Sequence, residues 1–179
     1  MRKIILLCGL TVLAAGIVQA GEVKVDWQEP EKFTDIRPAN DSRKAYRERV
    51  ITKFDGFFAE MAAKLPEGYQ WQVTVTDVDL AGDVDYFIHG AGNALRVVKD
   101  VYSPAVKFTY MLRDNHGEEV ASGEEKLRDM GFMHSLRSVS DNDEFRYEKQ
   151  MLQDWFKKVL EPKVEQYAQS LPKVSGPTP

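Results

Sequence analysis

A stripe of seven large apolar side chains constrains the fold of this chain more than any other feature. The apolar residues recur at steps of three and four, with charged residues between them, which predicts an amphipathic helix. Asp41 or Ser42 is placed to cap its first turn, and Pro66 ends it. Burying such a side chain contributes about 1.5–3 kcal/mol, so the stripe must pack on an extended surface. Its members are Tyr46, Val50, Phe54, Phe57, Phe58, Met61 and Leu65.

We expect the surface under this helix to be a β-sheet, because alternation with period two marks several segments. The clearest pair is 106–113 and 119–127, which an Asn-His-Gly turn at 115–117 joins into a hairpin. The glycine- and aspartate-rich segment 81–93 is typical of a loop. The expected strands are 21–27, 69–80, 94–102, 106–113 and 119–127.

A second amphipathic helix is expected from Phe145 to Leu160. Glu148 is the one polar residue on its apolar stripe, and Pro162 is expected to kink or restart the helix. The element order is then β-α-β-β-β-β-α. Tight connections between the late strands and two one-sided helices predict an α+β two-layer sandwich. Its mainly antiparallel sheet has about five strands, with two helices on one face.

The first twenty residues have the pattern of an export signal. Arg2 and Lys3 precede an apolar run of roughly fifteen residues, which is short for a bilayer span. Val18 and Ala20 are the small residues that a signal peptidase recognises, which predicts cleavage after Ala20; an uncleaved anchor helix is the alternative. We therefore expect a signal peptide at 1–20, a single domain at 21–170 and a flexible tail at 171–179.

Cleavage changes the composition that matters for function. Of the 179 residues 159 remain, and the net charge falls from −4 to −6 because Arg2 and Lys3 are removed. Cys8 is removed too, so the mature chain can form neither a disulfide nor a thiolate zinc cluster. The acidic balance excludes nucleic acid as the main partner. We expect a periplasmic protein without a transmembrane helix, whose partner is an unknown envelope protein or a small ligand.

Four aspartates near the end of the second expected strand form a candidate metal site. Oxygen ligands around a turn suit a hard cation such as calcium. Counted as an EF-hand loop, positions one, three, seven and nine are Asp77, Asp79, Asp83 and Asp85. Ala81 at position five and Ile88 at position twelve break the pattern, and no helix precedes it. The alternative is that these aspartates accept hydrogen bonds from nearby backbone amides.

No other segment has the spacing of a catalytic motif. His89, His116 and His134 show no metal-ligand spacing, and no G-x-S-x-G elbow is present. Composition permits a scattered Ser-His-Asp triad, which keeps a cryptic envelope hydrolase as an alternative. The charged run 124–129 has mixed signs, which is typical of mutual ion pairing at a surface. Its functional alternative is an edge on which a partner docks.

Short motifs along the mature chain resemble those of a known family. They are 25–30 (VDWQEP) with 33–37 (FTDIR), 73–83 (VTVTDVDLAGD), 126–132 (KLRDMGF), and 147–149 (YEK) with 155–156 (WF). Together they resemble an uncharacterised group of proteobacterial exported proteins, domain of unknown function 3016. The resemblance covers nearly all of the mature chain and implies a Gram-negative exported protein. It implies no activity for any residue.

These observations favour a non-enzymatic periplasmic binding or interaction module, with no catalytic residue and no cofactor predicted. A calcium-dependent envelope module that uses the loop Asp77–Asp85, and the hydrolase named above, are the alternatives.

The export signal makes a prediction about the mature N-terminus. When the full-length gene product is expressed and the periplasmic fraction is purified, intact-mass and N-terminal sequencing should identify Gly21 as the first residue. Replacing Ala20 with Phe should block processing, because the signal peptidase requires a small residue there. A periplasmic product that still begins at Met1 would contradict the cleavage site.

Overall fold

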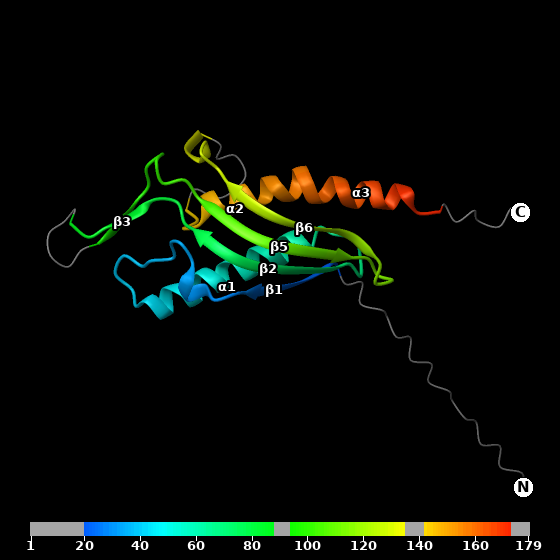
Figure 1. The fold of residues 1–179 in the computed structure, drawn as a ribbon, viewed down its shortest axis with the longest axis horizontal. Coiled ribbons are helices and arrows are strands. Elements are labelled where there is room, and N and C mark those ends of the chain that lie inside the picture. Colours follow the sequence, from blue (N-terminus) through cyan, green and yellow to red (C-terminus); the bar gives the residue numbers. More distant parts are fainter. Residues whose placement is uncertain (1–19, 88–93, 135–141, 173–179) are drawn as a thin grey trace, which may run out of the picture.

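The computed structural model describes residues 20–87, 94–134 and 142–172, so the predicted signal peptide lies almost entirely outside them. The main sheet contains β1 Glu22–Trp27, β2 Gln70–Asp79, β5 Ala105–Arg113 and β6 Glu119–Arg128. The helices are α1 Arg43–Ala62, α2 Arg146–Trp155 and α3 Glu161–Ser170. Short 3-10 turns occur at Pro30–Lys32 and Phe132–His134. In Figure 1 the strands cross in front of α1 and of the α2–α3 segment.

The main sheet has the strand order β1-β2-β5-β6 and is mainly antiparallel. β1 runs parallel to β2, because α1 carries the chain back along the sheet between them. The β2–β5 and β5–β6 pairs are antiparallel, and the predicted hairpin is present with Val106 opposite Leu127. The predicted α+β class with a mainly antiparallel sheet is confirmed.

The core lies between the helices and one face of this sheet, and every member of the α1 stripe is buried. Trp71 of β2 stacks on Trp155 of α2, with ring centroids 6.2 Å apart. Phe58 of α1 meets the same Trp71 edge-on at 5.5 Å. One tryptophan of the sheet therefore contacts both helical segments, and aromatic packing of this kind contributes beyond the area buried.

The ends of the helices follow from local chemistry. The Ser42 hydroxyl accepts a hydrogen bond from the Ala45 amide at 3.2 Å, so Ser42 rather than Asp41 caps α1. Toward the C-terminus a π-helical turn at Phe156–Leu160 joins α2 to α3. Pro162 lies in the first turn of α3, where its missing N–H and its ring disturb the preceding turn. Pro162 thus perturbs the helix near the expected place, but the chain stays helical from Arg146 to Ser170 and does not restart.

Two expectations about residues 81–102 are wrong. β3 Asp83–Asp85 lies inside the expected loop, and β4 Leu95–Val97 replaces the long strand expected at 94–102. The two pair antiparallel as a separate sheet that projects from one end of the main sheet (Figure 1). The main sheet therefore has four strands instead of about five. We call residues 83–87 and 94–102 the arm.

Gly82, where the chain enters the arm, generates a stability prediction. Its φ is +83°, and a Cβ there would lie 2.6 Å from the Val97 carbonyl oxygen. Gly117 in the β5–β6 turn has a φ of +85° with no atom within 4 Å of a Cβ. Gly117→Ala should therefore lower the free energy of unfolding by about 1–2 kcal/mol from the left-handed backbone alone.

Gly82→Ala should lower the free energy of unfolding by more than Gly117→Ala, because the arm backbone must also move. Urea unfolding followed by tryptophan fluorescence measures both. Equal losses in the two variants would contradict the close packing of the arm on Gly82.

Candidate functional site

The arm leaves the main sheet at the end of β2, and the loop after β1 lies beside this point. Asp35 in the loop and Asp79 of β2 form an isolated parallel bridge. The Asp35 amide donates to the Val78 carbonyl at 3.0 Å, and the Leu80 amide donates to the Asp35 carbonyl at 3.0 Å. The loop thus continues the β1–β2 pairing and brings its polar side chains to the end of β2. We call the region formed by Asp35, Arg37, Asp79, Gly82 and Asp83 the arm base.

The carboxylate of Asp35 organises the arm base. Its side chain is 6% exposed and forms ion pairs with two arginines. Arg37 donates from Nε to Oδ1 at 3.0 Å, and Arg96 donates from Nη1 to Oδ2 at 3.0 Å. Burial disfavours the charged carboxylate, but the hydrogen bonds from Arg96 and Arg37 outweigh it and lower the pKa of Asp35. Asp35 therefore remains ionised at neutral pH as the counter-ion of both arginines.

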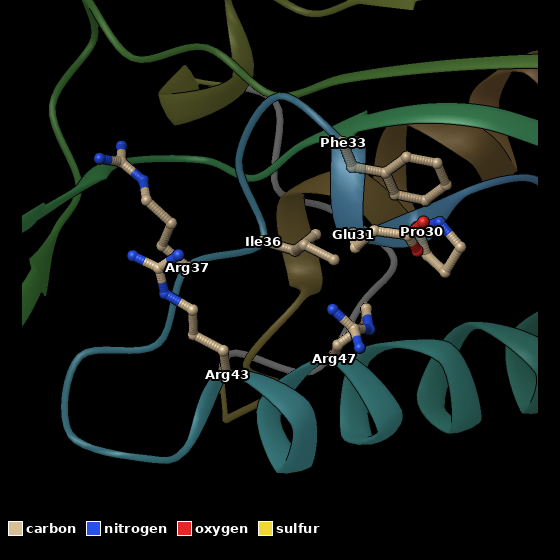
Figure 2. Close-up of a pocket in the computed structure, with 7 residues that line it drawn as sticks. All are labelled: Pro30, Glu31, Phe33, Ile36, Arg37, Arg43 and Arg47. Carbon is tan, nitrogen blue, oxygen red and sulfur yellow. The ribbon is translucent and has the colours of Figure 1, made fainter.

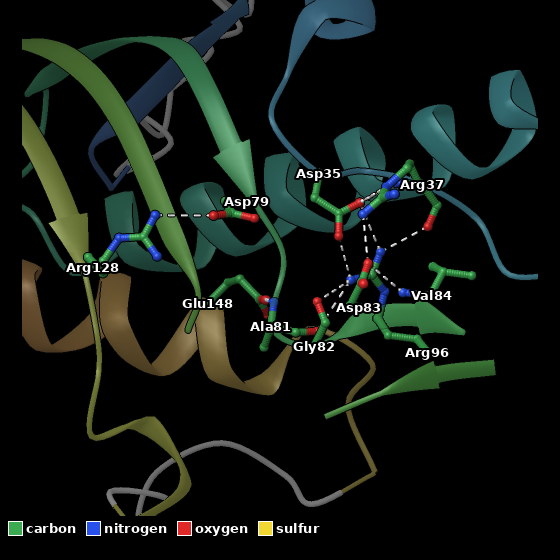
Figure 3. A network of polar contacts seen from close by, with 10 residues as sticks. All are labelled: Asp35, Arg37, Asp79, Ala81, Gly82, Asp83, Val84, Arg96, Arg128 and Glu148. Atoms are coloured by element: carbon green, nitrogen blue, oxygen red, sulfur yellow. Dashed lines mark hydrogen bonds and ion pairs between the residues drawn. The ribbon is translucent and has the colours of Figure 1, made fainter. Parts of the chain in front are cut away.

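The guanidinium of Arg96 joins three segments of the chain (Figure 3). Besides its bonds to Asp35, it donates to the Gly82 carbonyl at 3.0 Å and to the Arg37 carbonyl at 2.9 Å. Burial opposes the charge of Arg96, but Asp35 more than compensates and raises its pKa. A single side chain of β4 thereby holds the arm to the end of β2 and to the loop after β1.

Glu148 of α2 brings a second carboxylate to the arm base. The residue is 2% exposed, and its Oε1 accepts a hydrogen bond from the Ala81 amide at 2.6 Å (Figure 3). Burial raises the pKa of Glu148 to about 7, although the Ala81 bond and the charge of Arg96 act in the opposite direction; the nearby Asp143 adds to the rise. The charge of this buried group therefore changes near neutral pH.

Two of the four aspartates proposed as metal ligands point to separate cationic partners. Asp77 accepts from Lys107 Nζ at 2.8 Å and from the amide and hydroxyl of Thr34 at 2.7 and 2.9 Å. Asp79 accepts from Arg128 Nη2 at 3.1 Å. Burial raises the pKa of Asp79, and the bond from Arg128 offsets this only in part.

The other two aspartates contact the arm base and the arm itself. Asp83 accepts from Arg37 Nη2 at 2.7 Å, and Asp85 accepts from the Phe87 amide at 2.8 Å. The structure therefore gives the four carboxylates different partners. Within residues 20–87, 94–134 and 142–172, no group of three or more His, Cys, Asp or Glu side chains could hold a metal ion. Calcium binding stays a hypothesis that these contacts do not favour.

A cleft of about 230 Å³ opens at the arm base, with Tyr102 and Arg128 in its lining. Arg128 donates from Nη1 to the Ser103 hydroxyl at 2.9 Å while its Nη2 reaches Asp79. Within the charged run 124–129, Lys126 pairs with Glu124 at 2.9 Å, which agrees with the expected mutual pairing. Arg128 instead leaves the run to form part of the cleft.

The two histidines in the described residues are absent from the lining of the cleft and from the hydrogen bonds of the arm base. His116 lies in the β5–β6 turn and His134 in a 3-10 turn, whereas His89 lies outside the described residues. Among the described residues, neither of the two histidine side chains forms a hydrogen bond with a serine hydroxyl. The hydrolase alternative therefore gains no support here.

Sequence reasoning did not recognise Asp35, Arg96 and Glu148 as parts of one site. Asp35 lies in one of the motifs that carry the family resemblance, and Glu148 interrupts an apolar stripe, where a glutamate is seldom buried. Those two signals were available. Arg96 gave none, because it lies 61 residues from Asp35 in the sequence.

Glu148→Gln should reveal the buried titration. The unfolded glutamate ionises near pH 4.5 and the folded one near 7. The stability contributed by this group is therefore complete below about pH 4.5 and is lost as the pH rises through 7, by roughly 3 kcal/mol. Urea unfolding between about pH 5 and 8 should show that the free energy of unfolding of the variant rises relative to that of the wild type as the pH rises.

Glu144→Gln is the matched control, because Glu144 is 47% exposed and pairs with Arg49 at 3.1 Å. Its stability difference from the wild type should vary little over the same pH range. A difference for Glu148→Gln that is independent of pH would show that the buried carboxyl does not titrate there.

Comparisons with known proteins place the chain in a family. No curated protein and no solved structure matches it. In the part of the chain that the structure describes, no helix has the length and apolar character needed to cross a membrane. One family model, described as "Protein of unknown function (DUF3016)", matches residues 21–158, which is most of the chain and includes the arm and its base. This match confirms the resemblance drawn from the sequence motifs, and the chain therefore belongs to the DUF3016 family.

Proposed function

We propose that this protein is a periplasmic interaction module that binds a partner protein through its arm and has no catalytic role. The observation that carries the proposal is the exposure of large apolar side chains on the arm. Phe87 is 89% exposed and Val101 is 72% exposed. Among the described residues eight large apolar side chains are exposed, and five belong to the arm: Tyr86, Phe87, Leu95, Val101 and Tyr102.

These side chains share a surface. Tyr86, Phe87 and Tyr102 line one shallow hollow of about 160 Å³, and Tyr102 with Val101 also lines the cleft at the arm base. We call Tyr86, Phe87, Val101 and Tyr102 the apolar patch. Exposed clusters of aromatic and aliphatic side chains are typical of protein-binding surfaces, because burying them against a partner removes apolar surface from water.

The attachment of the arm supports the same function. Arg96 holds β4 to Asp35, and Asp83 of β3 pairs with Arg37, so both strands of the arm are tied to the arm base. A surface that is already held in place loses less conformational entropy on binding than a free loop does. The contacts of the arm thus suit the presentation of a defined apolar surface.

The charges near the patch indicate the kind of partner. Asp85 and Asp100 lie on the arm beside Lys99, and Asp79 and Asp83 line the cleft. Asp79 and Asp83 are already paired with Arg128 and Arg37, so the unbalanced charge near the patch is that of Asp85 and Asp100 against Lys99. We therefore expect the partner to offer an apolar site whose rim is weakly basic, because such a rim complements this small negative charge. The periplasmic location is supported by the signal-like residues 1–20 alone.

Photo-crosslinking in cells tests the proposal. Incorporating p-benzoylphenylalanine in place of Phe87 should give a crosslinked adduct of defined mass. The same residue in place of Thr109, an exposed position on the polar face of β5, should not give that adduct. No adduct from either position, or the same adducts from both, would contradict the assignment of the arm as the binding surface.

Once the partner is purified, Phe87→Ala should weaken binding by about 30-fold or more, as expected for an aromatic residue at the centre of an interface. The melting temperature should stay nearly unchanged, because the side chain is exposed.

A further inference from the structure

A hollow of about 80 Å³ lies between the loop after β1 and the first turns of α1 (Figure 2). Phe33 and Ile36 of the loop supply apolar walls. Arg43 and Arg47 extend toward the loop from α1, and Arg37 lies at one side. Three arginines therefore surround a small space in a chain whose net charge is negative.

The three arginines differ in their partners. Arg37 is neutralised by Asp35 and Asp83. Among the described residues, by contrast, Arg43 and Arg47 form neither an ion pair nor a side-chain hydrogen bond. Their guanidinium groups are thus available to a ligand.

The position of the two unpaired arginines adds to the positive potential. Arg43 and Arg47 are four residues apart on α1, so they lie on one face of the helix, where like charges repel each other. They also occupy its first turns, where the helix dipole is positive. Among the described residues, Glu31 is the one acidic side chain in the lining of the hollow. The hollow therefore carries a positive charge that the protein itself does not balance.

We propose that this hollow binds an oxyanion, and specifically a phosphoryl group. The planar guanidinium fork of arginine matches the geometry of phosphate oxygens, and hydrogen bonds between charged groups are about twice as strong as neutral ones. A space of roughly 10–15 Å³ by the same measure holds one water molecule, so the hollow has room for a group several times larger. The walls formed by Phe33 and Ile36 exclude water from one side and strengthen the attraction.

The site is distinct from the apolar patch and does not rest on the proposed interaction function. The phosphoryl group can belong to free phosphate or to a phospholipid headgroup, and both present the same oxygens to Arg43 and Arg47.

Calorimetry at low ionic strength with inorganic phosphate and with pyrophosphate tests the site directly. We expect binding that weakens at least tenfold in the double variant Arg43→Ala/Arg47→Ala. The control Lys44→Ala/Lys64→Ala removes the same charge from exposed positions outside the hollow and should bind as the wild type does. Arg43→Lys/Arg47→Lys keeps the charge but loses the fork, and should bind less tightly than the wild type.

Co-sedimentation with vesicles distinguishes the two sources of phosphate. Phosphatidylcholine vesicles with and without phosphatidylglycerol are compared for the wild type and both alanine double variants. Binding to vesicles that depends on Arg43 and Arg47, without calorimetric binding of free phosphate, assigns the site to lipid headgroups. Binding to neither ligand, or equal loss in the control variant, overturns the proposal.

Discussion

The ion pair between the buried Asp35 and the largely covered Arg96 is the interaction on which the arm depends. Without Asp35, Arg96 would lose its counter-ion in a largely covered place, and removing one partner of a buried pair costs about 3–5 kcal/mol. Apolar residues of the same size can stabilise a protein equally well, so stability alone does not explain the pair. A guanidinium group also bonds in several fixed directions, and Arg96 uses them to hold the Gly82 and Arg37 carbonyls together with Asp35. The pair thereby defines where the arm begins.

The elements that could be predicted from the sequence are those whose side chains alternate over many residues. β2, β5 and β6 each have nine or ten residues, and α1 has twenty, so their buried faces repeat often enough to be recognised. β3 and β4 have three residues each, which is too short for a period to appear. Their pairing depends on Gly82 and Arg96, whose contacts are distant in sequence. The sequence pattern therefore predicts the arm partly as a loop and partly as a strand of the main sheet.

The candidate site was less predictable than the fold for a related reason. The aspartates at 77–85 were recognised as a polar cluster, but their partners Lys107, Arg128 and Arg37 lie 30, 49 and 46 residues away from the carboxylates that they bind. The sequence places the carboxylates close together but does not show which lysine and arginine side chains pair with them. A bound metal ion is therefore the positive charge that the sequence pattern suggests for them. Glu148 is recognisable in the sequence as a charged residue on an apolar stripe. Only the fold shows that its carboxylate accepts a hydrogen bond from the Ala81 amide.

Two local rules are broken together at the arm, the end of the molecule that we propose as the binding surface. A two-stranded sheet is marginal by itself, and large apolar side chains in water contribute nothing to folding. The arm combines both features, while Asp35, Arg96 and Glu148 bear the cost of desolvating charge beside it. The main sheet has aromatic packing on one face and polar residues such as Gln72 and Thr109 exposed on the other, and among the described residues its buried Trp71 Nε1 has no hydrogen-bond partner. Natural proteins tolerate such local conflicts mainly at functional sites. An exposed apolar arm held by buried charges is consistent with a surface selected for binding, because the fold gains no stability from that exposure.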